Sequence, residues 1–266
     1  MSLAGGSVFA DLVRSLGPYL GEVVFVGGWV QALYVLEAEG SGARVVRTSD
    51  IDLTLAPTLH LSDRPPLLDL LREAGFEVLA FDDESGYEVS KASIEVDLLA
   101  EGPAPGAPVK IEGQPDLRAF GYPYQGLLRA HTRRMLVGSS VDDSLKTPVE
   151  ILVPTLPAYT IGKLLCSAHR HLRAKQAKDL IYVTELMARE QLATLIIEGI
   201  PQVIATHPDE GRKARQWLSA AINDRRLIED AANQVVESSG FGIDDNSPVR
   251  AEVVTRLRRL SEEAWP

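Results

Sequence analysis

Residues 23–55 join a glycine pair to an aspartate pair, and this stretch narrows the folds open to the chain more than any other. It begins with apolar residues of the β-branched and aromatic types, which predict a buried strand ending at Gly27 and Gly28. A helix is expected from Trp29, because apolar residues then recur at helical spacing until further glycines stop the pattern. A second strand is expected over residues 50–55. The two pairs are therefore carried by successive elements.

The second strand alternates, so its two aspartates share one face. Ile51, Leu53 and Leu55 can enter the core, while Asp50 and Asp52 project together on the other side. Two neighbouring carboxylates repel one another. A divalent cation would relieve that repulsion, and Mg²⁺ is commonly bound by one or two carboxylates together with substrate phosphates.

Each pair also has an ordinary explanation when it is taken alone. A glycine pair at a turn often serves a positive φ angle or tight packing. An acidic pair is common on the solvated face of a strand. A strand–glycine–helix junction, however, also exposes backbone N–H groups to which phosphate oxygens can bind. The order of the two pairs along the chain favours a site for a metal-bound triphosphate.

This arrangement resembles the nucleotidyltransferase superfamily of the DNA polymerase β type. That family requires a third carboxylate on a later strand, and residues 94–99 fit, with Glu95 and Asp97 on one face; we select Asp97. Three sequence segments, GGWVQALY, RTSDIDLTL and the later KLL…R…KDL, resemble those of the bacterial branch that contains abortive-infection type toxins and related uncharacterised nucleotidyltransferase-fold proteins. The resemblance covers most of residues 22–187. It departs at residues 37–46, an insertion that separates Gly28 from Asp50 further than in compact members.

The resemblance implies a Mg²⁺-dependent or Mn²⁺-dependent enzyme that transfers a nucleoside monophosphate from an NTP to a hydroxyl acceptor and releases pyrophosphate. Asp50 and Asp52 would hold the metals, and Asp97 would complete the acceptor-side metal of a two-metal arrangement. The acceptor, whether RNA, protein or small molecule, is left open. The alternative is a non-catalytic module on the same fold that binds nucleotide or a protein partner, as in toxin–antitoxin pairs.

Nucleotide contacts are also expected from residues outside the carboxylates. Gly27 and Gly28 would approach the phosphates, and Trp29 would cover the nucleotide unless it only packs in the core.

In the second half of the chain, the resemblance assigns Lys163, Arg170 and Lys178 to the β- and γ-phosphates, with Asp179 holding a cation in place. From the residues alone, Lys163 could equally be a core-flanking lysine whose ammonium group reaches solvent. The run 169–175 could meet an acidic acceptor such as an RNA end, or be a solvated turn. Its histidines have no metal-site spacing.

The pattern changes at Pro154 and Pro157, after which helical periodicity replaces strand signals. We therefore predict an α/β nucleotidyltransferase-like domain over residues 1–153, with a mixed sheet and flanking helices, and an all-helical domain over residues 154–266. The expected strands and helices of the first half, besides those above, are a helix over 8–16, a helix capped by Ser62 or Asp63, strands over 76–81, 87–90, 93–99 and 150–153, a loop over 102–108, and a region of undecided type over 118–137. The expected helices of the second half span 158–170, 174–188, 190–200, 212–223, 227–237 and 248–263.

Composition limits the remaining function classes. The formal charge of −10 over 266 residues argues against broad binding to nucleic-acid backbones. The one cysteine, Cys166, excludes an internal disulfide and suits a reducing compartment. No stretch has the apolar length of a membrane span, and no signal peptide is recognisable, so a cytoplasmic protein without membrane association is expected. The oligomeric state is not predicted.

Overall fold

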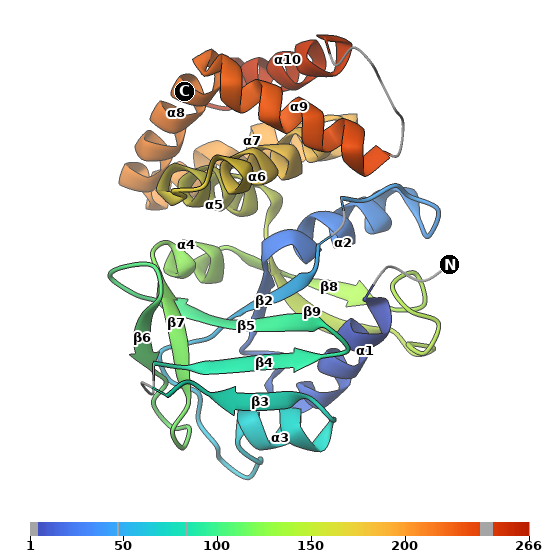
Figure 1. The fold of residues 1–266 in the computed structure, drawn as a ribbon, viewed down its shortest axis with the longest axis vertical. Helices are drawn as coiled ribbons and strands as arrows, with labels where there is room; N and C mark the ends of the chain where they lie inside the picture. The colour runs from blue at the N-terminus through green and yellow to red at the C-terminus, as the bar shows by residue number, and fades with distance from the viewer. Residues whose placement is uncertain (1–4, 47, 83–84, 240–246, 266) are drawn as a thin grey trace. The chain divides into compact units, whose positions relative to one another are not determined.

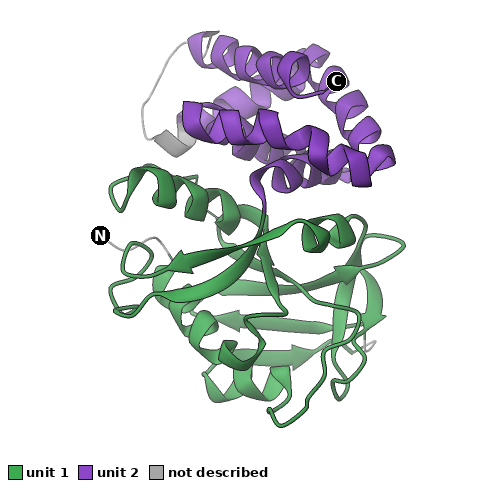
Figure 2. Ribbon diagram, turned by 180° about the vertical axis from the view of Figure 1, so that it is seen from behind, with its two compact units in different colours: residues 1–154 green, residues 155–266 purple. Residues whose placement is uncertain are grey.

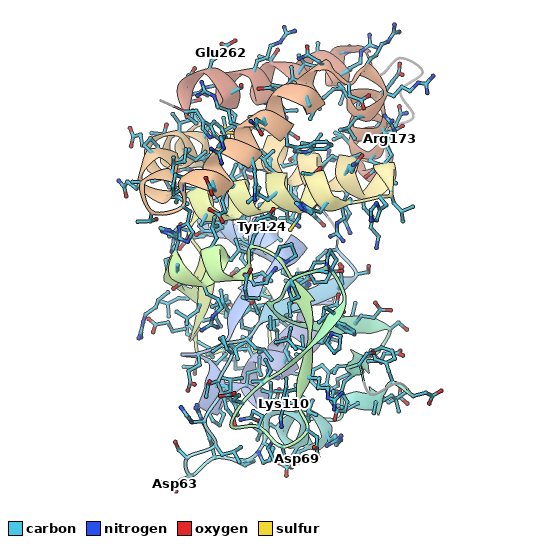
Figure 3. The ribbon with its side chains drawn as sticks, turned by 90° about the vertical axis from the view of Figure 1, so that its left-hand side faces the viewer. Asp63, Asp69, Lys110, Tyr124, Arg173 and Glu262 are labelled. Atoms are coloured by element: carbon cyan, nitrogen blue, oxygen red, sulfur yellow. The ribbon has the colours of Figure 1, made fainter. Side chains whose placement is uncertain are left out.

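The computed structural model describes residues 5–46, 48–82, 85–239 and 247–265. It divides into two compact units, residues 1–154 and residues 155–266 (Figure 2). The first unit is an α/β unit and the second is built from helices (Figure 1). Charged side chains such as Asp63, Asp69 and Glu262 extend outward from the unit that carries them (Figure 3).

One mixed sheet forms the centre of the α/β unit. Its strands follow one another in the order β3-β4-β5-β2-β1-β9-β8, while β7 pairs with β5 and β6 pairs with β7. The strands of the described residues are β1 (Val24–Val26), β2 (Asp50–Thr54), β3 (Glu77–Ala80), β4 (Tyr87–Lys91), β5 (Ile94–Glu101), β6 (Ala107–Lys110), β7 (Arg118–Tyr122), β8 (Thr132–Val137) and β9 (Val149–Pro154). The central pair is β2 and β5, which run parallel.

Alternation along the two central strands decides which residues enter the core. Ile51 and Leu53 of β2 and Val96 and Leu98 of β5 are at most 1% exposed. The carboxylates between them are half-buried on the opposite face. The period-two expectation for both strands is confirmed.

Four α-helices and one short 3₁₀ helix accompany the described part of this sheet. They are α1 (Gly6–Ser15), the 3₁₀ helix η1 (Gly17–Tyr19), α2 (Gly27–Glu39), α3 (Leu67–Glu73) and α4 (Gln125–Ala130). Helix α2 packs against β1 and β2, α3 against β3, and α4 against β5. The predicted glycine stop is confirmed for α2, because Gly40 follows its last residue with φ +83°.

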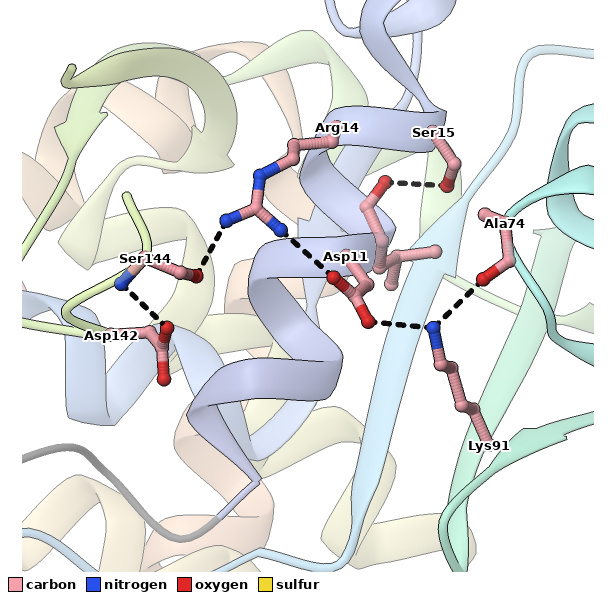
Figure 4. Close-up of polar contacts among 8 residues, drawn as sticks. Asp11, Arg14, Ser15, Ala74, Lys91, Asp142 and Ser144 are labelled. Atoms are coloured by element: carbon pink, nitrogen blue, oxygen red, sulfur yellow. Dashed lines mark hydrogen bonds and ion pairs between the residues drawn. The ribbon is translucent and has the colours of Figure 1, made fainter. Parts of the chain in front are cut away.

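Polar contacts join α1 to three other parts of the unit (Figure 4). Lys91 on β4 donates to Asp11 at 2.6 Å and to the carbonyl oxygen of Ala74, after α3, at 2.7 Å. Arg14 donates to Asp11 at 2.8 Å and to the hydroxyl of Ser144 at 2.5 Å. The helix is thereby connected to β4, to the end of α3 and to the loop after β8.

Three expectations for the first unit need correction or completion. Helix α3 begins after Pro66, so neither Ser62 nor Asp63 is its cap; the N-cap is Pro66, with φ −54° and ψ +145°, and no side chain caps the helix. Strand β6 begins at Ala107, inside the stretch predicted as a loop, because β7 offers it an antiparallel partner. The undecided region 118–137 contains β7, α4 and β8 in succession.

The second unit contains α5 (Leu156–His169), α6 (Arg173–Met187), α7 (Glu190–Thr206), α8 (Pro208–Asn223), α9 (Arg225–Ser239) and α10 (Ser247–Glu263). All six lie where helices were predicted, but α7 continues through Pro201 instead of ending at Ile200. Val203 is buried beyond that proline, so packing maintains the helix. A Cβ atom at Gly199 would meet Pro157 Cγ at 2.3 Å, which shows how closely α7 packs against α5. Among the described residues, no helix combines the length and apolar character needed to cross a membrane.

Candidate functional site

Three carboxylates meet on one face of the central strand pair. In the parallel register of β2 and β5, Asp52 lies opposite Asp97, and Asp50 lies opposite Glu95. One carboxylate oxygen from each of Asp50, Asp52 and Asp97 lies within 4.8 Å of the other two. The register thus brings together two aspartates and a third that is distant in sequence.

Glu95 shares the face of Asp97 but remains outside this cluster. It is exposed, whereas Asp50, Asp52 and Asp97 are half-buried. The sequence could not separate the two acids by face, because they are two residues apart on one strand. In the structure, Asp97 is the one beside Asp52.

Gly27 allows the carboxylate of Asp52 to approach the start of α2. Its φ angle is +70°, and an added Cβ atom would lie 1.7 Å from Asp52 Oδ2. No residue with a side chain fits there without displacing the carboxylate. Because Gly27 is the first residue of α2, the acidic cluster adjoins a helix N-terminus, where backbone N–H groups have no partner inside the helix.

The donor set fits a divalent cation. Carboxylate oxygens are hard ligands of the kind that Mg²⁺ and Mn²⁺ bind, and three of them converge here. Their convergence is unfavourable without a compensating positive charge, because like charges at this separation repel. The residues present therefore suit the metal that the sequence predicts.

A contact that the sequence analysis did not identify supports the first carboxylate. The Thr48 hydroxyl donates to Asp50 Oδ1 at 2.5 Å. The sequence signal for this contact is a threonine two residues before an aspartate, since Thr side chains commonly hydrogen-bond to groups two residues away.

Trp29 lies in the core of the α/β unit. Its side chain is 2% exposed and stacks on Phe9, with ring centroids 4.5 Å apart. This contact gives the ring a packing role. A contact with nucleotide stays a prediction.

Two of the three cations predicted for the phosphates contact one acid of the helical unit, and the third lies near the ring of Tyr182. Lys163 on α5 donates to Asp179 Oδ1 at 3.0 Å, and Arg170 Nε lies 3.5 Å from Asp179 Oδ2. The ammonium group of Lys163 also lies 4.7 Å from the centroid of the Tyr182 ring, and that of Lys178 lies 5.9 Å from it. The expectation that Asp179 holds a cation is therefore met geometrically, while the phosphate contacts stay predictions.

Burial and charge act in opposite directions on Lys163. Burial is the largest single influence and lowers its pKa, but the Asp179 carboxylate, acting together with Tyr159, Tyr182 and Cys166, outweighs burial and holds the pKa well above the ordinary lysine value. The side chain of Asp179 is 4% exposed and that of Lys163 11%. Lys163 is therefore a positively charged group in a largely buried ion pair, and its ammonium does not simply extend into solvent.

Comparisons of the sequence and the structure with known proteins identify the family to which this chain belongs. No curated protein matches the sequence significantly. The solution structure of the antibiotic-resistance factor ANT(2'')-Ia matches 88% of this chain and 100% of its own, with 12% identity and a TM-score of 0.37. This likeness is too low to bear on substrate. A family model described as nucleotidyltransferase matches residues 7–195, which include every carboxylate of the cluster and Lys163. On that match over more than half of its length, the chain belongs to the nucleotidyltransferase family.

Proposed function

We propose that this protein transfers a nucleoside monophosphate from an NTP to a hydroxyl acceptor, with Mg²⁺ or Mn²⁺ as its metal and pyrophosphate as the product. The observation that carries the proposal is the convergence of Asp50, Asp52 and Asp97 within 4.8 Å. Family membership supplies the reaction class. A cytoplasmic location, where NTPs and Mg²⁺ are available, is part of the proposal.

The three aspartates would hold the metal through their carboxylate oxygens. When bound, the ion would offset phosphate charge and lower the pKa of the acceptor hydroxyl. Gly27 and Gly28 would let the triphosphate approach the N–H groups at the start of α2. The acceptor oxygen then bonds to the α-phosphorus, the α–β phosphoanhydride bond breaks, and pyrophosphate leaves with that electron pair while the hydroxyl proton passes to solvent.

Lys163, Arg170 and Lys178 form the second part of the proposal. We assign them to the β- and γ-phosphates, where positive charge would stabilise the departing pyrophosphate. Their support is the family resemblance and their clustering around Asp179 and Tyr182. Because Asp179 binds two of them, it would fix where their charges lie.

Labelled nucleotides test the reaction. The protein is incubated with Mg²⁺, each of the four NTPs labelled at the α-phosphate, and in turn RNA, a cell lysate and hydroxyl-bearing small molecules. Transfer of label to one acceptor, with release of unlabelled pyrophosphate, is the expected result. Asp52→Asn and Asp97→Asn should abolish transfer.

A different result would favour the non-catalytic alternative. If the wild-type protein binds Mg²⁺ and NTP but yields neither labelled acceptor nor pyrophosphate, the transfer reaction is refuted and a nucleotide-binding or toxin–antitoxin type module remains. The acidic cluster would then serve binding alone.

A further inference from the structure

Asp50 has less support from the sheet than its two neighbours in the cluster. Asp52 pairs with Val26 of β1 on one side and with Asp97 of β5 on the other. Asp50 is the first residue of β2 and lies opposite Glu95 of β5, while the β1 register ends with Val26 opposite Asp52. Strand pairing therefore leaves the Asp50 position less constrained than that of Asp52.

Repulsion adds to this difference. One carboxylate oxygen of Asp52 and one of Asp97 lie within 4.8 Å of an Asp50 carboxylate oxygen, and like charges at that separation repel one another. The Asp52 carboxylate lies against Gly27, where contact with the start of α2 limits its position.

Thr48 contacts Asp50 from the segment that precedes β2. Its hydroxyl donates to Asp50 Oδ1 at 2.5 Å, and its Oγ1 is 3.4 Å from the Asp50 carbonyl oxygen. Threonine is branched at Cβ, so few side-chain rotamers compete with the one that makes this bond. A hydrogen bond to a carboxylate is also stronger than one between neutral groups.

We infer that Thr48 is a positioning residue that holds the Asp50 carboxylate in the orientation required to bind a divalent cation. The inference rests on the metal site of the proposed function. It assigns to the hydroxyl the role that groups hydrogen-bonded to metal ligands have in many metal sites, where they orient the ligand before the ion binds.

Calorimetric titration with Mn²⁺ and with Mg²⁺, in the presence and absence of an NTP analogue that resists α–β cleavage, tests the inference. Thr48→Val keeps the shape of the side chain and removes the donor, whereas Thr48→Ser keeps the donor. Thr48→Val should weaken metal affinity roughly 10- to 100-fold, as removal of such supporting groups does elsewhere. Thr48→Ser should keep most of the wild-type metal affinity. Ser49→Ala, which removes the adjacent exposed hydroxyl, should bind as the wild type does.

A double-mutant cycle with Asp50→Asn shows whether the effect passes through Asp50. Thr48→Val should weaken binding in the wild-type background and have little further effect when Asp50 is asparagine. An equal loss in both backgrounds would overturn the inference, because Thr48 would then act elsewhere. Thermal unfolding of each variant checks that the fold is retained.

The failure of this inference and the failure of the metal site give different results. If the wild type binds the cation and Thr48→Val binds equally well, the positioning role is wrong and the proposed function stands. If the wild type binds no divalent cation, with or without the nucleotide analogue, both are overturned. In activity assays, a positioning role predicts that Thr48→Val raises the Mg²⁺ concentration needed for half-maximal rate by a larger factor than it lowers kcat.

Discussion

At Gly27, one added methyl group would affect both the backbone and the acidic cluster. The φ angle of +70° disfavours alanine, and its Cβ atom would overlap Asp52 Oδ2. We expect Gly27→Ala to lose about 1–3 kcal/mol of stability and most of the metal affinity. Gly40→Ala is the matched control, because φ there is +83° and nothing lies within 4 Å of its added Cβ atom.

Unfolding and metal titrations of the two glycine variants would separate the effects. Both variants should be less stable than the wild type, because each places alanine at a positive φ angle, but only Gly27→Ala should lose divalent-ion binding. Normal metal affinity in Gly27→Ala would show that the Asp52 carboxylate can move aside without consequence for the site.

Asp52→Asn removes one of three mutually repelling charges and should fold normally. The wild-type protein should gain thermal stability as Mg²⁺ is added, because a ligand that binds only the folded state stabilises it in proportion to RT ln(1 + [L]/Kd). The variant should show little of this gain. Melting curves over a range of Mg²⁺ concentrations measure both, and equal gains in the two proteins would exclude Asp52 as a ligand.

Between helices, the pair formed by Lys163 of α5 and Asp179 of α6 should dominate the response to substitution. Asp179→Asn leaves the ammonium group of Lys163 in a largely buried place without its strongest partner, and we expect a loss of about 3 kcal/mol. Adding Lys163→Met should recover part of that loss, because the double variant no longer buries the Lys163 ammonium group without its partner. Urea denaturation of the single and double variants is the measurement. A double variant that is less stable than Asp179→Asn would contradict this account.

The same double variant tests the phosphate role of Lys163 with stability largely restored. If Lys163 contacts the triphosphate, affinity for NTP–Mg²⁺ should fall roughly ten- to hundredfold, while affinity for the matching NMP changes less. Arg170, which also faces Asp179, remains in the variant. Unchanged affinities for both nucleotides would leave Lys163 with a role in helix packing alone.

Local pattern was sufficient for most elements and insufficient for some boundaries. The strand–glycine–helix order and the alternation of β2 and β5 follow from contacts within a few residues. Strand β6 could not be found in this way, because it depends on its partner β7. Region 118–137 fits either period, and packing alone selects the order of β7, α4 and β8.

For the whole molecule, the division at Pro154 and Thr155 raises the question of independent folding. We propose that residues 1–153 and 154–266 are separate domains, each with its own core. A separately produced fragment of residues 155–266 should have the circular dichroism of a helical protein and unfold cooperatively on heating. A fragment without cooperative unfolding would show that the two units fold as one.

The sequence by itself determined the elements that carry the site and the residue types on their exposed faces. These depend on a period of two in strands and of 3.6 in helices, and both are local properties of the chain. Asp97 was selected over Glu95 from the sequence, but only the tertiary structure brought it together with Asp50 and Asp52, laid Asp52 against Gly27 and paired Lys163 with Asp179. Strand register and helix packing minimise the free energy of the assembled core, so the contacts they create between distant residues cannot be derived from any one segment.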